Sequence, residues 1–536
     1  MAHDTAIRLF IKASKKSPQL KLLRITPEEH EHMMDLFLQI HNVPNDPTNR
    51  EENALKKAKL IKDLAKNAFD ISSEEKKERV KVELISSVDS STKTLTHNVQ
   101  VTLGNSSNGP NVLLMVHHDT IAAEDYSLAF QPINESNELV GQTIQDNTIH
   151  VAAALSILGK LVIPDRGAIS IIFTDHEENG CRGSSSMTGK LLQEIDLTSP
   201  LILLANESTN QKLALGHRGK YSAELIEKIQ DGHVANTFFS FYQTLVTAQN
   251  RAWDESSRKS ILGQTAGSST YGFIDEKNTF AKLDFRTNDF VTPNKVESIW
   301  QEAIRYKKLM ADSEILQNAK KFMEKGFCDL KITEAGIMIT SISEAFHPSV
   351  FNPKKDETTM PAVYLALKAM EEMGLAKKVT QIDWGEKTKQ NSNPMWAVIA
   401  MNTTNLSKKK MLNAMKDVKA KKEVVSKSGF KFALDNKKTI KTPCVVSPKD
   451  DVVNKITRQL GEQINQKVEL TTMNFMTDIA KLFALAKKRG QKTYGFVYGV
   501  GFPKLHGIER VTVEESILIQ SAMRAILPIM HEAISD

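Results

Sequence analysis

The sequence predicts an α/β protein in which a mostly parallel central sheet, flanked by helices, is interrupted by an inserted α+β segment. Short apolar runs at 111–116, 169–173 and 201–205 have the length and composition of strands that are buried on both faces. From about residue 219, strand-like segments alternate with long amphipathic helices, which is typical of an α+β arrangement. The α/β pattern returns from about residue 440, so two separated segments are expected to form one domain.

The length of 536 residues exceeds what a single core usually supports, which indicates more than one domain. We predict that residues 1–218 and 440–536 form the discontinuous α/β domain and that residues 219–439 form the insertion. The pattern of strands and helices recurs within the insertion. It therefore predicts two subdomains, at about 219–330 and 331–439, each with helices on one face of its sheet.

Composition indicates a soluble globular protein, because 40% of the residues are hydrophobic and 25% are charged. The cysteines Cys181, Cys328 and Cys444 are too far apart for a disulfide framework or a zinc finger, which suits a reducing compartment. No apolar run approaches the roughly 20 residues of a membrane span, and no signal-peptide core is found. Lysine clusters lack interleaved aromatic residues, which is typical of a solvated surface. We therefore expect a cytoplasmic protein without nucleic-acid or membrane partners.

The segment before the first apolar run is expected to be helical and then extended. Residues 27–70 carry apolar side chains at helical spacing, with a break at Pro44–Pro47. Residues 78–103 alternate between apolar and polar side chains, which predicts paired strands.

The strand at 111–116 runs into His117 and Asp119. An imidazole can bind a metal ion through one nitrogen, while a carboxylate two positions on can accept the other N–H and fix the ring. The alternative is a histidine that merely caps a buried strand. His118 should point to the opposite face, and we assign it no role.

Asp146 comes directly before a helix rich in alanine, leucine and isoleucine. Such an aspartate can cap the helix N-terminus, or it can project its carboxylate into a cleft. We expect His150 to lie on the helix face rather than to bind a metal.

Two further apolar runs are followed by carboxylates. Glu177 and Glu178 follow the run at 169–173, and Glu207 follows the run at 201–205. Adjacent glutamates point in different directions, so one can bind a metal while the other handles a proton. One such carboxylate is ordinary surface chemistry. Several at the carboxyl ends of parallel strands, where sites of such sheets lie, predict a metal centre.

The order of these residues resembles a di-zinc metallopeptidase family (metallopeptidase clan MH) that includes aminoacylase, carnosinase, carboxypeptidases and PepV-type dipeptidases. The matching motifs are His117-x-Asp119, Asp146, Glu177-Glu178-x-Gly180-x-x-Gly183, Glu207 and the late His506-Gly-Ile-Glu509-Arg. The resemblance covers most of the chain, and the layout is most similar to that of the PepV-type dipeptidases. It implies a zinc-peptidase catalytic domain with an inserted lid of two ferredoxin-like subdomains.

The resemblance also implies a two-metal site. Asp146 would bridge two metal ions, His117 and Glu207 would complete one site, and Glu178 and His506 would complete the other. Imidazole and carboxylate ligands without cysteine suit zinc, and also cobalt or manganese.

Two residues beside these ligands are implied to serve the reaction. Asp119 would orient His117, and Glu177 would be the general base that deprotonates the water bridging the two metal ions. Paired metals acidify such a water and polarise a carbonyl, and a free carboxylate can pass the proton to the leaving amine.

The insertion resembles the lid of this family, which supplies a histidine to stabilise the oxyanion. His347, within Phe-His-Pro-Ser, is the first candidate and His233 the second. Arg286 resembles a lid arginine that grips the substrate carboxylate, a task suited to a bidentate guanidinium. The alternatives are a helix-capping His347 and an Arg286 paired with Asp284 or Asp289. A doubled lid in one chain favours a monomer, with a homodimer as the alternative.

Several segments depart from the usual family pattern. Asn147-Thr-Ile-His150 replaces the Asp/Asn-Lys-x-Gly that usually follows the bridging aspartate, and Met-Asn-Phe-Met replaces a glycine-rich loop before Thr477-Asp478. None of these changes removes a ligand, but the second alters the wall on the substrate side.

We therefore expect a zinc-dependent metallopeptidase that hydrolyses amide bonds in short peptides as a dipeptidase or aminopeptidase. The alternative enzyme is an N-acyl amino acid deacylase or a metallocarboxypeptidase. The alternative outside enzymes is an inactive metal-binding lid protein, against which the intact Glu177 argues.

Overall fold

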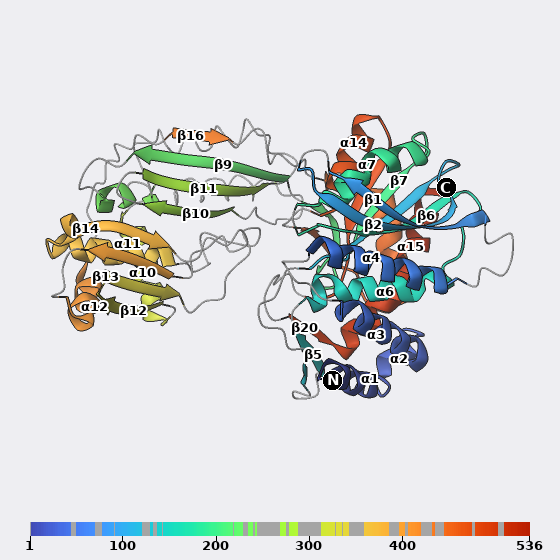
Figure 1. Ribbon diagram of the computed structural model, residues 1–536, viewed down its shortest axis with the longest axis horizontal. Coiled ribbons are helices and arrows are strands. Elements are labelled where there is room, and N and C mark those ends of the chain that lie inside the picture. The colour runs from blue at the N-terminus through green and yellow to red at the C-terminus, as the bar shows by residue number, and fades with distance from the viewer. Residues whose placement is uncertain are drawn as a thin grey trace. The chain divides into compact units, whose positions relative to one another are not determined.

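The computed structural model divides by its internal contacts into two compact units, Met1–His217 with Thr442–Asp536, and Arg218–Lys441 (Figure 1). It describes residues 2–43, 50–69, 78–89, 92–120, 129–131, 137–141, 143–178, 180–217, 219–228, 234–239, 242–243, 268–274, 278–287, 312–326, 328–334, 336–341, 359–384, 396–401, 406–419, 431–434, 444–473, 477–501 and 509–535.

The first unit is built on a nine-stranded mixed sheet. Its order is β1-β2-β6-β3-β7-β19-β8-β17, with β18 pairing β8. The strands are β1 (Val80–Val88), β2 (Leu95–Asn105), β3 (Asn111–His117), β6 (Gly167–Thr174), β7 (Leu201–Ala205), β8 (Leu213–His217), β17 (Cys444–Val445), β18 (Leu470–Met473) and β19 (Thr493–Val497). The central neighbours β6, β3, β7 and β19 are parallel, and the outer pairs β1–β2 and β2–β6 are antiparallel.

The central strands β3, β6 and β7 are buried along their whole length, as their continuous apolar runs predict. His117 lies beside Thr174 on β6, and Met115 lies beside Ala205 on β7. Because these strands are parallel and in register, the residues that follow them emerge at one edge of the sheet. The predicted antiparallel pair at 78–103 is confirmed as β1 and β2.

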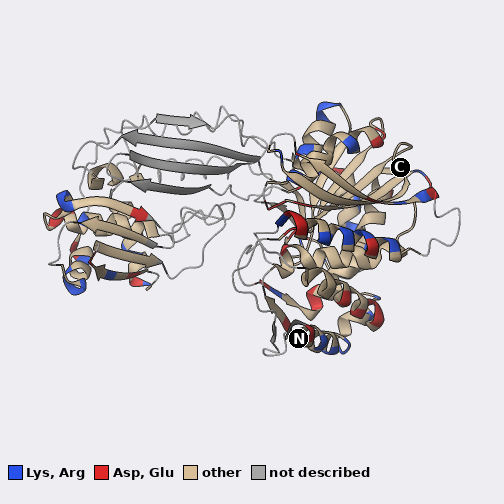
Figure 2. Cartoon of the chain, in the orientation of Figure 1, with Lys and Arg blue, Asp and Glu red and all other residues tan. Residues whose placement is uncertain are grey.

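The described helices of the first unit are α1 (Ala2–Ser14), α2 (Pro18–Leu22), α3 (Pro27–His41), α4 (Arg50–Asn67), α6 (Ile149–Ile157), α7 (Arg182–Glu194), α13 (Asp451–Ile464), α14 (Ala480–Lys488) and α15 (Val513–Ser535). Acidic and basic residues are interspersed along α1 and α4, which is typical of a solvated surface (Figure 2). Helix α3 begins with a complete capping box, in which Thr26 and Glu29 satisfy each other's backbone N–H groups. A small sheet of β4 (Ala129–Gln131), β5 (Glu138–Gly141) and β20 (Glu509–Thr512) completes this unit.

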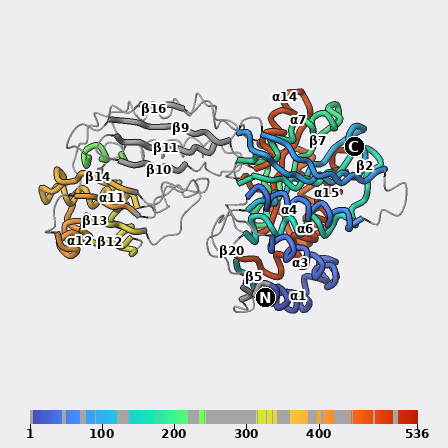
Figure 3. Tube along the Cα trace, in the orientation of Figure 1, coloured from blue at the N-terminus to red at the C-terminus, as the bar shows by residue number. Residues whose placement is uncertain are grey.

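Helix α15, near the end of the chain, packs against helices from its beginning. It contacts α1, α2 and α3, so the first and last segments of the sequence lie side by side (Figure 3). Among the described residues, it is the one helix long and apolar enough to cross a membrane, and most of it is buried within the protein. It contacts α6, α13 and the strands β3, β6 and β7, so its apolar side chains belong to the core of the unit.

The second unit contains an eight-stranded sheet of order β12-β13-β15-β14-β10-β11-β9-β16, and every pair in it is antiparallel. Its strands are β9 (Gly219–Lys228), β10 (Ser268–Ile274), β11 (Asn278–Thr287), β12 (Cys328–Thr333), β13 (Gly336–Ser341), β14 (Val379–Trp384), β15 (Trp396–Met401) and β16 (Lys431–Leu434). Its helices include α10 (Asp312–Glu324), α11 (Thr359–Glu372) and α12 (Lys408–Asp417).

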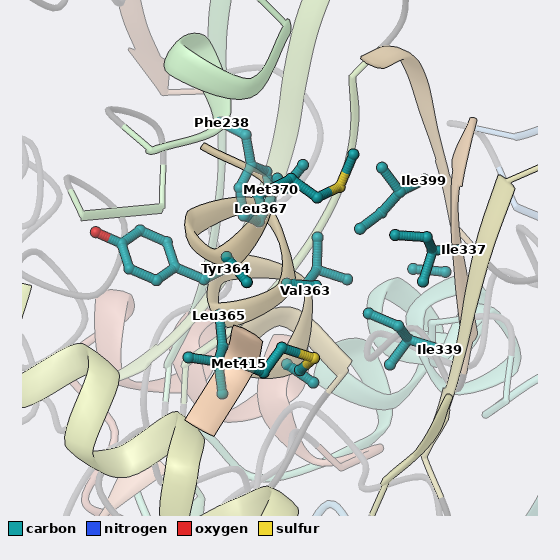
Figure 4. Close-up of a cluster of buried hydrophobic side chains, with 14 of the residues drawn as sticks. Phe238, Ile337, Ile339, Val363, Tyr364, Leu365, Leu367, Met370, Ile399 and Met415 are labelled. Atoms are coloured by element: carbon teal, nitrogen blue, oxygen red, sulfur yellow. The ribbon is translucent and has the colours of Figure 1, made fainter. Parts of the chain in front are cut away.

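The core of this second unit is apolar. Side chains of α11, such as Val363 and Leu367, face Ile337, Ile339 and Ile399 on β13 and β15 (Figure 4). The prediction of an α/β protein with an inserted α+β segment is confirmed, and the sheet of that segment is antiparallel. The strands on either side of the boundary predicted at about residue 330, which falls inside β12, share one sheet through the pairing of β10 with β14. The division into two subdomains stays a prediction.

Candidate metal centre

Three ligand-type side chains converge at the carboxyl edge of the first sheet. His117 ends β3, Glu207 follows β7 by two residues, and Asp146 lies in the irregular helical turn Ile144–Thr148 before α6. The Nε2 atom of His117 lies 2.9 Å from Oδ1 of Asp146 and 3.6 Å from Oε1 of Glu207. All three side chains are buried, and one ligand atom from each lies within 4.8 Å of the others. This imidazole and carboxylate set is one that zinc binds.

Asp119 lies behind this group and connects it to the next strand. Nδ1 of His117 is 3.0 Å from the backbone oxygen of Asp119 and 3.5 Å from its carboxylate, so the main-chain oxygen is the closer acceptor. The carboxylate accepts the backbone N–H groups of Glu177, at 2.9 Å, and Glu178, at 3.2 Å. Burial alone would raise the pKa of Asp119, but bonding to His117 and Glu177 lowers it, so this carboxylate stays ionised.

A tight turn after β6 presents Glu177 and Glu178. The backbone oxygen of Glu177 accepts the N–H of Gly180 at 2.7 Å and that of Cys181 at 2.9 Å. A Cβ at Gly183 would lie 2.1 Å from the backbone oxygen of Asp175. This close approach explains why a glycine occupies the last position of the motif Glu177-Glu178-x-Gly180-x-x-Gly183. The thiol of Cys181 donates to Oε1 of Glu177 at 3.3 Å. The turn thus holds both glutamates at the edge where His117 ends β3.

The carboxylates of the site are crowded together, with Asp146 and Glu207 buried and Glu177 and Glu178 half-buried. Burial, followed by the charge of Glu207, raises the pKa of Glu177 well above its ordinary value. Burial and the charge of Asp146 act in the same way on the pKa of Glu178. Burial also raises the pKa of Glu207, from 4.5 to about 7, although the charge of His117 opposes it. Such a cluster favours a bound cation, because a cation offsets the repulsion that otherwise forces protons onto these groups. The residues present therefore fit a divalent metal site.

Two acidic residues at this edge belong to the sequence motifs, although the sequence assigns them no role. Asp478 is buried, accepts a hydrogen bond from the Thr174 hydroxyl, and has its pKa raised by burial. Glu509 begins β20, and its Oε2 accepts the backbone N–H of Gln145 at 2.6 Å and of Asp146 at 3.2 Å. Burial and the charge of Asp146 raise the pKa of Glu509 to about 8. The sequence signals that could have identified them are the segments Thr477-Asp478, which contains Asp478, and His506-Gly-Ile-Glu509, which contains Glu509.

His150 supports the turn that carries Asp146. It is fully buried, lies with Nδ1 at 2.9 Å from the backbone oxygen of Gln145, and accepts the Val500 N–H at Nε2 over 3.2 Å. Because Nε2 accepts, Nδ1 carries the proton and donates to Gln145. His150 is therefore a buried residue of α6 that links two segments of the chain.

Four residues of the predicted site lie, wholly or with their side chains, outside the described part of the chain. His233, His347 and His506 lie outside the described residues. Arg286 lies in β11 with its backbone opposite Lys220 of β9, and its side chain is outside what the structure describes. The roles of these residues stay predictions.

Known peptidases are similar to this chain in sequence or in structure. The model of peptidase family M20/M25/M40 matches residues 113–525. Similar solved structures include aminopeptidase PepT from Bacillus cereus, with 12% identity and a TM-score of 0.49, covering 94% of this chain and 98% of that chain. Human carnosine dipeptidase 1 has 12% identity and a TM-score of 0.46, with coverage of 97% and 100%. The dipeptidase Dug1p from Saccharomyces cerevisiae has 12% identity and a TM-score of 0.45, with coverage of 99% of both chains. None of the curated proteins compared matches the sequence.

Proposed function

Because the chain belongs to peptidase family M20/M25/M40 and is thus a metallopeptidase that hydrolyses peptides, we propose that it is a two-metal dipeptidase or aminopeptidase acting on short peptides. The observation that carries the proposal is the buried group of His117, Asp146 and Glu207 beside the two glutamates of the β6 turn. A fold alone needs no such concentration of acidic side chains, whereas a two-metal hydrolase does.

Each residue has a separate task in this proposal. His117, Asp146 and Glu207 would hold one cation, and Glu178 with His506 would hold a second that shares Asp146. Two divalent cations bound there would polarise the scissile carbonyl and make a water molecule more acidic. Zinc suits this donor set, with cobalt and manganese as alternatives.

Glu177 would carry the proton. It is half-buried, its pKa is raised above the ordinary value of a glutamate, which favours the acceptance of a proton, and the Cys181 thiol donates to one of its oxygens. It would accept a proton from the attacking water and return it to the leaving amine, so the amide C–N bond breaks with no net change at Glu177.

Three further parts of the proposal rest on the sequence. Arg286 would bind the carboxylate of the peptide, and His347, or else His233, would stabilise the oxyanion. The two sets of lid strands favour a monomer. The separated cysteines favour a cytoplasmic location.

The test is hydrolysis of a panel of dipeptides, tripeptides and N-acetylated dipeptides by protein that has been stripped with a chelator and reloaded with zinc or manganese. We expect activity to return with metal, to be highest on dipeptides and to be lost when the substrate amine is acetylated. Cleavage of N-acyl amino acids instead would favour the deacylase. Stoichiometric metal binding without any hydrolysis would contradict an enzyme and favour a binding protein.

A further inference from the structure

Helix α4 brings two basic residues to the metal centre from outside the segment that matches the family model. That segment begins at residue 113, whereas α4 spans Arg50–Asn67. Lys57, which is only 7% exposed, donates from Nζ to the backbone oxygen of His118 at 3.0 Å. Arg50, at the start of the same helix, has Nη2 at 3.7 Å from Oδ2 of Asp119. Both contacts reach the strand end that carries His117.

The burial of Lys57 calls for an explanation. A lysine ammonium is strongly hydrated, so removing it from water costs several kcal/mol unless it gains acceptors and opposite charge. Burial lowers the pKa of Lys57 to about 8, while the charges of Asp119 and Asp175 oppose that change. Both aspartates belong to the strand ends around the metal centre. The opposite charges that stabilise the buried Lys57 ammonium therefore come from the strand ends of the site.

The residue that Lys57 contacts is held from three directions. The backbone N–H of His118 donates to the Thr174 oxygen on β6 at 2.8 Å. Its ring, pointing away from His117 as expected, lies with Nε2 at 2.9 Å from the backbone oxygen of His97 on β2. Its own backbone oxygen accepts from Lys57 on α4. The peptide between His117 and Asp119 is thus fixed by two strands and one helix.

We propose that Lys57 is a positioning residue of the metal centre, which holds the His118 carbonyl so that His117 and Asp119 keep the geometry that binds the cation. Arg50 assists from the surface through the Asp119 carboxylate. This inference rests on the proposed function only in that the site binds a divalent cation. It adds a dependence on a helix outside the segment that the family model matches.

The test is the zinc affinity of metal-free protein, measured by competition with a fluorescent chelator. Outer contacts of metal ligands typically change affinity by about 10- to 100-fold, and we expect Lys57→Met to weaken zinc binding by that factor. If Lys57 affected the site only through its positive charge, the opposite result is expected, because removing that charge should tighten the binding of a metal ion. Unchanged or tighter binding by Lys57→Met would therefore overturn the proposal.

The controls separate positioning from folding. Lys56→Met removes the neighbouring lysine, whose exposed side chain pairs with Glu52, and should leave zinc affinity unchanged. Lys57→Arg keeps a donor and a charge and should restore part of the affinity. If Lys57→Met does not fold, Arg50→Met, at a side chain that is 39% exposed, should still weaken binding, by a smaller factor. A lower thermal midpoint of the metal-free variant with wild-type zinc affinity would show a structural role only.

The proposed function and this inference fail in different ways. Wild-type protein that binds zinc tightly but cleaves no peptide contradicts the enzyme and leaves the affinity comparison valid. Wild-type protein that binds zinc, cobalt and manganese all weakly overturns both.

Discussion

Both units of the chain bury an apolar core, and the first unit also holds a cluster of ionisable groups. In the first unit, the carboxyl ends of β3, β6 and β7 lead into buried and half-buried carboxylates whose charges repel one another. In the second unit, α11 covers its sheet with apolar side chains such as Val363 and Leu367. Packing explains the second arrangement, because apolar burial stabilises a fold by itself. The first arrangement destabilises the fold until a cation is bound, so it indicates function.

Two buried lysines show the same contrast within one residue type. Lys368 in the second unit is 5% exposed, lies 4.1 Å from the centre of the Phe239 ring and 3.6 Å from Oε2 of Glu371. Its surroundings are an aromatic core and a carboxylate on its own helix, which suffice to stabilise a cation. Lys57, in contrast, donates to the peptide between two site residues. The two lysines are buried to a similar extent, so it is their contacts, and not their burial, that distinguish a functional role from a structural one.

The largest expected effect separates chemistry from metal binding inside the first unit. Glu177→Gln should keep the shape of the turn and the ligands, yet remove the group that carries the proton. Loss of a general base typically lowers kcat by about 10²- to 10⁴-fold, and we expect a decrease in that range with stoichiometric metal content. The measurement is kcat on the best dipeptide beside zinc content by elemental analysis.

The matched control is Glu469→Gln, at an exposed glutamate that pairs with Lys212 in the same unit. It should leave kcat unchanged. If Glu177→Gln retains activity, another carboxylate carries the proton, and Asp478, buried at the same edge, becomes the next candidate.

The next effect tests whether the apolar core is independent of the site. Leu367→Ala removes a fully buried side chain from α11, and such truncations typically cost about 2–5 kcal/mol. All four tryptophans, Trp253, Trp300, Trp384 and Trp396, belong to the second unit, so tryptophan fluorescence during denaturant unfolding reports that unit. We expect a lower midpoint with unchanged zinc affinity. A parallel loss of zinc affinity would show that the two units are coupled.

The sequence predicts the part of the site that lies at strand ends. Strands buried on both faces form continuous apolar runs, so the positions of these runs along the chain are enough to place His117 and Glu207 at an edge of the sheet. The α/β fold with its inserted antiparallel unit followed from the same patterns. Parallel register then brings distant residues together without further information.

The remaining contacts leave weaker traces in the sequence. Lys56 and Lys57 are adjacent, yet one is exposed and the other buried. Helical spacing places Lys57 on the same face as the buried Asn53 and Ile61, four residues away on either side. This spacing is the sequence signal that indicates the burial of Lys57. The single sheet of the second unit depends on one pairing, Ile274 with Ile382, between strands about a hundred residues apart. No local pattern encodes which strand edges meet.

The smallest expected effect is the pH dependence of the metal-free first unit. Glu207 has its pKa raised from 4.5 to about 7, and Glu509 to about 8, so the folded state binds more protons than the unfolded state between about pH 5 and 8. The free energy of unfolding should therefore fall as pH rises through this window. For Glu207 alone the decrease is about 3 kcal/mol at most. The raised pKa of His117 acts in the same direction, because its stabilising protonated form is lost as pH rises.

Added zinc should reverse this dependence, because the metal binds deprotonated carboxylates and neutral imidazole and therefore binds more tightly as pH rises. Hydrogen exchange of peptides from residues 111–217, measured at pH 5.5 and 8 with corrections for intrinsic exchange rates, would report the first unit directly. We expect faster opening at pH 8 without metal and slower opening at pH 8 with zinc, while peptides from α11 change with neither. Metal-free protein that is most stable at pH 8 would contradict the raised pKa values of Glu207 and Glu509. Other groups of the folded protein would then already neutralise the charges of these carboxylates.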